Sequence, residues 1–221
     1  AKELLEAITK VVIKQQTGSL EILGNIQHQL ESEGIFIIKE HQIKPEQTAF
    51  IRDYFYQEVS PALVTIILNE EVELPLLKDS AAYLAVKMNL AEDRRQYALI
   101  EISKSMDRFV VLPEIDGKKY IIMIDDLLRY CLSDIFSIFK FHSISAHMIK
   151  ITRDGELDFD SDLSKSFLSK ISDSVKDRKI GEPVRFVFDK TIDEDTLGYL
   201  MQIKGIDRTD SVIPGGRYHN R

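Results

Sequence analysis

The residues best suited to bind phosphate lie near the end of the chain, in residues 211–220, which read Ser-Val-Ile-Pro-Gly-Gly-Arg-Tyr-His-Asn. Pro214 fixes its own φ and favours an extended conformation in the residue before it. Gly215 and Gly216 permit positive φ, so that successive backbone N–H groups can converge on an anion. Arg217 adds a planar guanidinium that matches phosphate oxygens. The run predicts either a phosphate-binding turn or a tight turn whose glycines let the backbone pass close to another segment.

Three further side chains are candidates for phosphate contacts: His219, Arg153 and Arg185. The imidazole of His219 titrates near neutral pH and could donate a proton or contact phosphate. Its alternative role is that of a turn histidine packed against a following domain. Arg153 and Arg185 fall within or at the ends of predicted strands, where an arginine is costly unless it is paired or faces an anion. The alternative for both is a salt bridge, within the domain or across a subunit contact.

Other patterns predict no catalytic residue and no metal site in this chain. Acidic residues alternate over residues 154–162 as calcium ligands do, but an EF-hand would require Gly at Phe159 and Glu at Lys165. Cys131 is the single cysteine, which excludes an internal disulfide and a cysteine-based metal cluster. Its position on an apolar helix face predicts a core residue. The glycine-rich nucleotide-binding motifs and the hydrolase nucleophile motif are absent from the sequence.

Hydrophobic periodicity predicts helices in the first part of the chain. Residues 1–33 form either one long helix or two, with a bend near Thr17 and Gly18 as the alternative, and Gly34 suits the helix end. A second helix is expected after Pro45. The apolar stripe on these helices requires a partner, as in a helix bundle of which only part is present.

After a predicted linker between Pro61 and Pro75, the spacing of hydrophobic residues changes from the pattern of helices to that of strands. Strands are predicted at residues 83–90, 97–102, 109–112, 120–124, 143–152 and 184–188, and helices at 125–139, 161–176 and 192–202. The last of these helices begins with a capping-box pattern, Thr191-x-x-Glu194. We therefore expect an α+β fold, in which a helical N-terminal segment precedes a domain with a mixed or antiparallel sheet.

Composition limits the classes of partner. The net charge is −7, from 29 basic and 36 acidic residues, which argues against a broad nucleic-acid-binding face. Apolar residues make up 44% of the chain, but they never form a continuous run of about 18 residues. The sequence therefore predicts no integral membrane segment. With no signal peptide found, we expect a cytoplasmic protein.

The run Pro-Gly-Gly-Arg-Tyr-His-Asn resembles a signature of the bacterial, phosphohistidine-forming polyphosphate kinases. Four other blocks are similar to that family in the same order. They are Ala-Tyr-Leu-Ala-Val from residue 82, the strand-to-helix block of residues 122–136, Ile-Thr-Arg-Asp from residue 151 and Glu-Pro-Val-Arg-Phe from residue 182. The resemblance covers essentially the whole chain.

This resemblance implies a division into three parts: residues 1–60, the end of an N-terminal helical domain; residues 61–207, a middle or head domain; and residues 208–221, the lead-in to a catalytic domain that lies outside the chain. Family members use Mg²⁺ and ATP to extend polyphosphate, with ADP as the other product, and their catalytic histidine lies outside this chain. The resemblance therefore implies that the chain alone is inactive and holds no cofactor stably. It further implies a homo-oligomer, a dimer or higher, formed through the middle domain beside the polyphosphate tunnel. The rival hypothesis is a non-enzymatic protein–protein interaction module.

Overall fold

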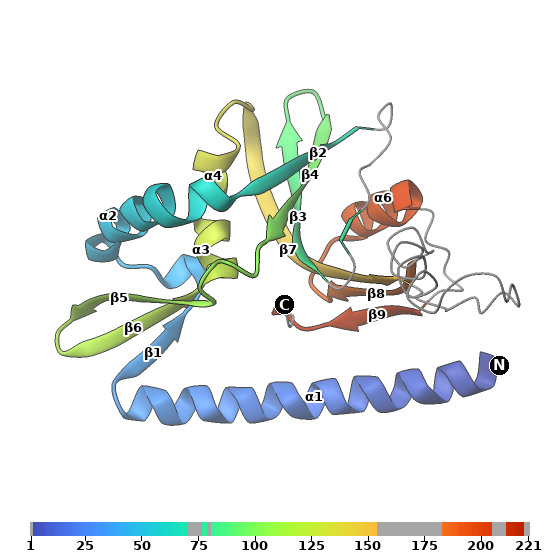
Figure 1. Ribbon diagram of the computed structural model, residues 1–221, viewed down its shortest axis with the longest axis horizontal. Coiled ribbons are helices and arrows are strands. Elements are labelled where there is room, and N and C mark those ends of the chain that lie inside the picture. Colours follow the sequence, from blue (N-terminus) through green and yellow to red (C-terminus); the bar gives the residue numbers. More distant parts are fainter. Residues whose placement is uncertain (1, 70–76, 79–80, 154–182, 205–210, 219–221) are drawn as a thin grey trace, which may run out of the picture.

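The computed structural model describes residues 2–69, 77–78, 81–153, 183–204 and 211–218, which form two β-sheets flanked by helices (Figure 1). The helices are α1 (Lys2–Ser32), η1 (Glu40–Gln42), α2 (Pro45–Tyr54), η2 (Phe55–Val59), η3 (Ser60–Ala62), α3 (Ile124–Tyr130), α4 (Leu132–Ile135) and α6 (Glu194–Lys204). The strands are β1 (Ile35–Ile38), β2 (Val64–Leu68), β3 (Ala82–Leu90), β4 (Arg95–Ile102), β5 (Phe109–Ile115), β6 (Lys118–Met123), β7 (Phe141–Arg153), β8 (Pro183–Asp189) and β9 (Ser211–Gly215).

The larger sheet has six strands in the order β2-β4-β3-β7-β8-β9. Its neighbouring strands run antiparallel except for the last pair, β8 and β9, which run parallel. The smaller sheet has the order β1-β6-β5, in which β1 and β6 are parallel and β5 and β6 antiparallel. The predicted α+β class with mixed sheets is confirmed.

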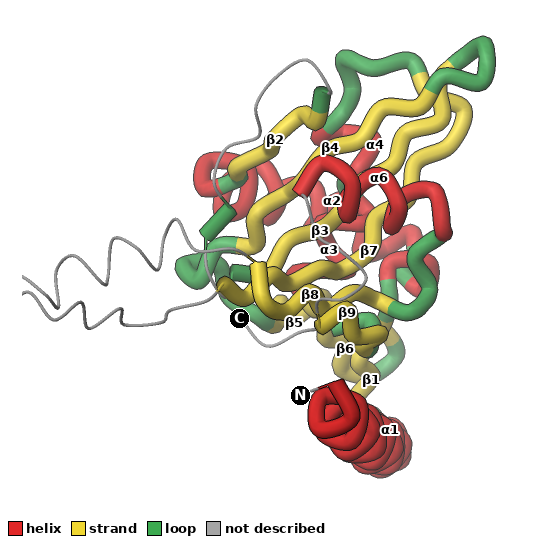
Figure 2. The backbone as a smooth tube through the Cα atoms, turned by 90° about the vertical axis from the view of Figure 1, so that its right-hand side faces the viewer, coloured by secondary structure: helices red, strands yellow, loops and turns green. Residues whose placement is uncertain are grey.

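Two hydrophobic cores lie on opposite faces of β3, because successive side chains of a strand point to opposite sides. Leu84 and Val86 face the larger core, which also holds buried residues of α2, α3, β5 and β6. Tyr83 and Ala85 face the smaller core, which is covered by α6. Figure 2 shows α6 lying across the strands of the larger sheet.

Because α2 is part of the larger core, that core continues across residue 60. Ile51 and Phe55 are buried together with residues of β3 and β6. The division of the chain at residues 60 and 207 into separate domains stays a prediction.

The first helix is continuous from Lys2 to Ser32, so the bend considered near Gly18 is not present. Gly34 follows the helix with a φ of 75°, as expected for a residue just past a helix end. Part of the predicted apolar stripe is uncovered, since Leu4, Ile8 and Val11 are each more than half exposed. A partner for this stripe stays a prediction.

Three local predictions differ from the structure, and one strand was not predicted. Residues 35–38 form a strand that the pattern did not indicate, and the predicted linker after Pro61 contains β2. The helix predicted over residues 125–139 is broken at Cys131, where ψ is 6°. The capping box at Thr191 is wrong, because Asp193 caps α6 through the Thr196 backbone N–H at 3.1 Å. The helix predicted over residues 161–176 and the acidic run before it lie outside the described residues.

Candidate functional site

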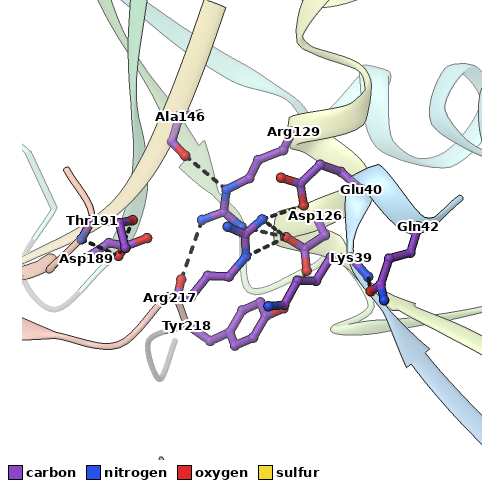
Figure 3. A network of polar contacts seen from close by, with 10 residues as sticks. All are labelled: Lys39, Glu40, Gln42, Asp126, Arg129, Ala146, Asp189, Thr191, Arg217 and Tyr218. Atoms are coloured by element: carbon purple, nitrogen blue, oxygen red, sulfur yellow. Dashed lines mark hydrogen bonds and ion pairs between the residues drawn. The ribbon is translucent and has the colours of Figure 1, made fainter. Parts of the chain in front are cut away.

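Strand β9 brings the Pro-Gly-Gly-Arg-Tyr run to the start of α3. It lies at one edge of the larger sheet and pairs with β8, with Ile213 opposite Val187 and Gly215 opposite Asp189. The extended conformation expected around Pro214 is confirmed, since this residue lies within β9. Directly after the strand, Arg217 and Tyr218 contact α3 (Figure 3).

Asp126 is the centre of the polar network in Figure 3, and its side chain is fully buried. Its Oδ1 accepts hydrogen bonds from Arg217 Nε at 3.1 Å, Arg217 Nη2 at 2.6 Å and Arg129 Nη1 at 2.8 Å. Its Oδ2 accepts a hydrogen bond from the Tyr218 hydroxyl at 2.6 Å. A buried carboxylate is stable when opposite charges and hydrogen bonds compensate for lost hydration. Asp126 has both.

Arg129 and Glu40 extend this network to two other elements. Arg129, one turn after Asp126 in α3, donates from Nε to the Ala146 carbonyl of β7 at 3.0 Å. Its Nη2 lies 3.5 Å from the Arg217 carbonyl. The guanidinium of Arg217 also pairs with Glu40 of η1. The network therefore joins the C-terminal segment to α3, β7 and η1.

The contacts in the network shift the pKa of Asp126, Arg217 and Tyr218. Burial alone would raise the pKa of Asp126, but the Tyr218 hydrogen bond and the charges of Arg129 and Arg217 outweigh it and lower this pKa. Burial likewise opposes the charge on Arg217, yet Asp126 and Glu40 raise its pKa. Burial and the hydrogen bond to Asp126 both raise the pKa of Tyr218. These directions keep Asp126 and Arg217 charged and Tyr218 neutral at neutral pH.

The predicted phosphate-binding turn does not form in the way expected. Within the described residues, the glycines with positive φ are Gly34 and Gly117, so Gly215 and Gly216 do not provide an anion-binding turn through positive φ. A Cβ on Gly216 would lie 3.2 Å from Leu20 Cδ2 of α1. The geometry at Gly216 matches the alternative, a backbone that passes close to another segment.

Three of the predicted phosphate ligands nevertheless line one pocket, of about 450 Å³. They are Arg185, Gly215 and Gly216, and Lys150 of β7 lines it with them. Arg217 lies beside this pocket, but its guanidinium contacts two carboxylates. The side chain of Arg153 and the whole of His219 lie outside the described residues. Phosphate binding by these residues stays a prediction.

The network was predictable from the sequence only in part. Asp126 and Arg129 belong to the strand-to-helix block, and their i, i+3 spacing in a predicted helix indicates an ion pair. Nothing in the sequence pairs Arg217 with Asp126 or Glu40, because those contacts depend on how the sheets pack. Cys131 is fully buried, as predicted for a core residue, and burial raises the pKa of its thiol to about 12.

A comparison with known families identifies the chain's relatives. The family model for the polyphosphate kinase middle domain matches residues 46–221. The chain belongs to the polyphosphate kinase family. Both α3 and the segment after β9 lie within the match, whereas Glu40 precedes it.

Individual polyphosphate kinases are similar over the whole chain. The chain is 36% identical over 225 residues to polyphosphate kinase from Vibrio parahaemolyticus, covering 100% of this chain and 32% of that protein. The Escherichia coli K12 polyphosphate kinase is 35% identical and is covered to 33% of its length. The crystal structure of the Porphyromonas gingivalis polyphosphate kinase matches with a TM-score of 0.76 at 25% identity, covering 98% of this chain and 31% of that one. The chain thus spans about a third of the length of the polyphosphate kinases it matches.

Proposed function

We propose that this chain is the scaffolding part of a polyphosphate kinase. The complete enzyme would transfer the terminal phosphoryl group of ATP reversibly to polyphosphate, with a phosphohistidine intermediate that divides the transfer into two displacements. Arginines and Mg²⁺ would neutralise the phosphates as the transferred group loosens. The phosphorylated histidine would belong to a catalytic region outside this chain, so the chain alone would be inactive.

The observation that carries this proposal is the anchoring of Arg217. Its guanidinium is held by Asp126 and Glu40, and Tyr218 next to it donates to Asp126. These contacts hold Arg217 and Tyr218 against α3 and η1. Such anchoring would allow the head domain to hold a following catalytic region in place.

Mg²⁺ and ATP are better assigned to the catalytic region than to this network. Among the described residues, no group of three or more His, Cys, Asp or Glu side chains could hold a metal ion. Asp126 already accepts hydrogen bonds from two arginines and a tyrosine. Asp126 is therefore a poor ligand for Mg²⁺. Also within the described residues, no helix is both long and apolar enough to span a membrane.

The proposed activity can be tested with two purified proteins, this chain and the product of the complete reading frame that encodes it. ATP-dependent polyphosphate synthesis is measured for each in the presence of Mg²⁺. We expect synthesis by the longer protein and none by the chain, since the catalytic histidine would be present only in the former. Synthesis by the chain alone, or none by the longer protein, would contradict the proposal.

We also propose that the head domain forms a homodimer through the edge of its smaller sheet. Strand β5 is an edge strand whose side chains Phe109 and Val111 are 52% and 66% exposed. Exposed apolar side chains on an unpaired edge favour association with another chain.

Sedimentation velocity tests the dimer. We expect the wild-type chain to sediment as a dimer and Val111→Glu to weaken association at least about tenfold, because a carboxylate would be desolvated at the contact. Ile138→Glu is the control, since Ile138 is 85% exposed and lies outside the strands. A monomeric wild-type chain, or an unaffected Val111→Glu variant, would refute this contact.

A further inference from the structure

His147 of β7 is a half-buried, titratable side chain outside the Asp126 network. Its Nδ1 is enclosed and has no hydrogen-bond partner in the part of the chain that the structure describes. A neutral imidazole can leave Nδ1 as a lone pair, whereas the protonated ring carries a hydrogen on both nitrogens. Protonation in this position would therefore leave an enclosed N–H group without an acceptor, which is costly.

The register of β3 and β7 places His147 on the face of the larger sheet that α6 covers. His147 is paired with Ala85 of β3. Side chains two apart in a strand point to the same face, so Ile149 lies on the same side as His147. Ala85 and Ile149 both belong to the smaller core, as does Leu200 of α6. An opening of α6 would therefore expose the ring of His147 to water.

Charged groups from four parts of the fold act on His147. They are Asp189 at the end of β8, Asp193 before α6, Arg129 of α3 and Arg217 after β9. On the α6 side, Lys87 of β3 pairs with Asp193 at 2.8 Å and with Asp195 at 3.4 Å. The Oδ2 of Asp189 is enclosed and also has no hydrogen-bond partner among the described residues, so it does not bond to His147. His147 thus lies among charges of both signs.

Burial is the largest cause that holds the pKa of His147 below its ordinary value of 6.5. Arg129 and Arg217 lower this pKa further, whereas Asp189 and Asp193 oppose the shift. When α6 opens, hydration returns the pKa of the ring toward 6.5, so the open form binds more protons. The closed packing is therefore fully stable above about pH 6.5 and loses stability as the pH falls below that value.

We propose that His147 is a proton-sensitive switch that loosens α6 from the larger sheet in mildly acidic solution. The ring stays neutral while α6 covers it, and it accepts a proton when α6 lifts. Helix α2 packs in the larger core, on the opposite face of β3, so its protection should not respond to His147. The switch depends on the packing of β7 and α6 and not on kinase activity.

Hydrogen–deuterium exchange of the whole chain at about pH 7.5 and about pH 5.5 tests the switch, since this range spans the ordinary titration of histidine. Mass spectrometry resolves the exchange of α6 from that of α2. His147→Gln removes the titrating group, and comparing it with the wild type at one pH cancels the intrinsic pH dependence of exchange. We expect the wild-type rate at α6, relative to that of His147→Gln, to rise at least about threefold between the higher and the lower pH.

His142→Gln is the matched control, because it makes the same change at an exposed histidine of the same strand. Its exchange relative to the wild type should be equal at both pH values. The wild type also provides an internal test that needs no variant, since the ratio of exchange at α6 to exchange at α2 should rise as the pH falls. An unchanged ratio in the wild type, the same pH response in His147→Gln, or loss of the response in His142→Gln would overturn the switch.

Discussion

Replacing Asp126 with asparagine is expected to lower the free energy of unfolding by about 3–5 kcal/mol. The substitution preserves the shape of the side chain but removes the charge that two arginines share. Most of this loss would come from Arg129, because its side chain is only 4% exposed and its charge would lose its carboxylate partner. Breaking one side of a buried ion pair costs more than the pair contributes, since the remaining charge stays desolvated.

Denaturant unfolding at neutral pH, followed by circular dichroism, measures this effect. Asp53→Asn is the matched control, since Asp53 is an exposed carboxylate of α2. Its free energy of unfolding should change by no more than about 0.5 kcal/mol. A loss below about 1 kcal/mol for Asp126→Asn, similar to that of an exposed pair, would show that the network contributes little to stability.

Truncating Ile124 to alanine is expected to lower the free energy of unfolding by about 2–5 kcal/mol. Ile124 is the first residue of α3 and is fully buried in the larger core. Its removal leaves a cavity between the start of α3 and the sheets, and the surrounding core relaxes only partly. The residue directly precedes the acidic pair, so the same packing also positions Asp126.

Ile138→Ala makes the identical chemical change at a side chain that is 85% exposed. Its free energy of unfolding should remain within about 0.5 kcal/mol of the wild type. Equal effects of the two substitutions in the same denaturant titration would contradict the burial of Ile124. They would also contradict the placement of α3 against the core.

The sequence predicted elements well where one pattern was long enough to repeat. β3, β4 and β7 have runs of branched and aromatic residues, and these strands lie where the pattern placed them. Strand β1 has only four residues, Ile-Phe-Ile-Ile, and becomes a strand because it pairs with β6, which is distant in sequence. Strand β2 was missed for the same reason. It lies in the stretch between two prolines that was predicted to be a linker, and it becomes a strand because it pairs with β4.

The candidate site was predictable only in part for the same reason. The Pro-Gly-Gly-Arg-Tyr run predicted either that Arg217 would contact phosphate or that the glycines would form a tight turn. The groups it meets in this structure are the carboxylates of Asp126 and Glu40, which come from α3 and η1. Neither spacing nor periodicity can pair residues across the fold. Lys150 was missed because a single lysine in a strand carries no pattern of its own.

The most direct test of the account is a double-mutant cycle between Asp126 and Arg217. It requires the free energies of unfolding of the wild type, Asp126→Asn, Arg217→Gln and the double variant. We predict a coupling energy of at least about 1 kcal/mol, because the two side chains share hydrogen bonds around a buried carboxylate. A coupling energy near zero would contradict the claim that Arg217 anchors the C-terminal segment to the head domain.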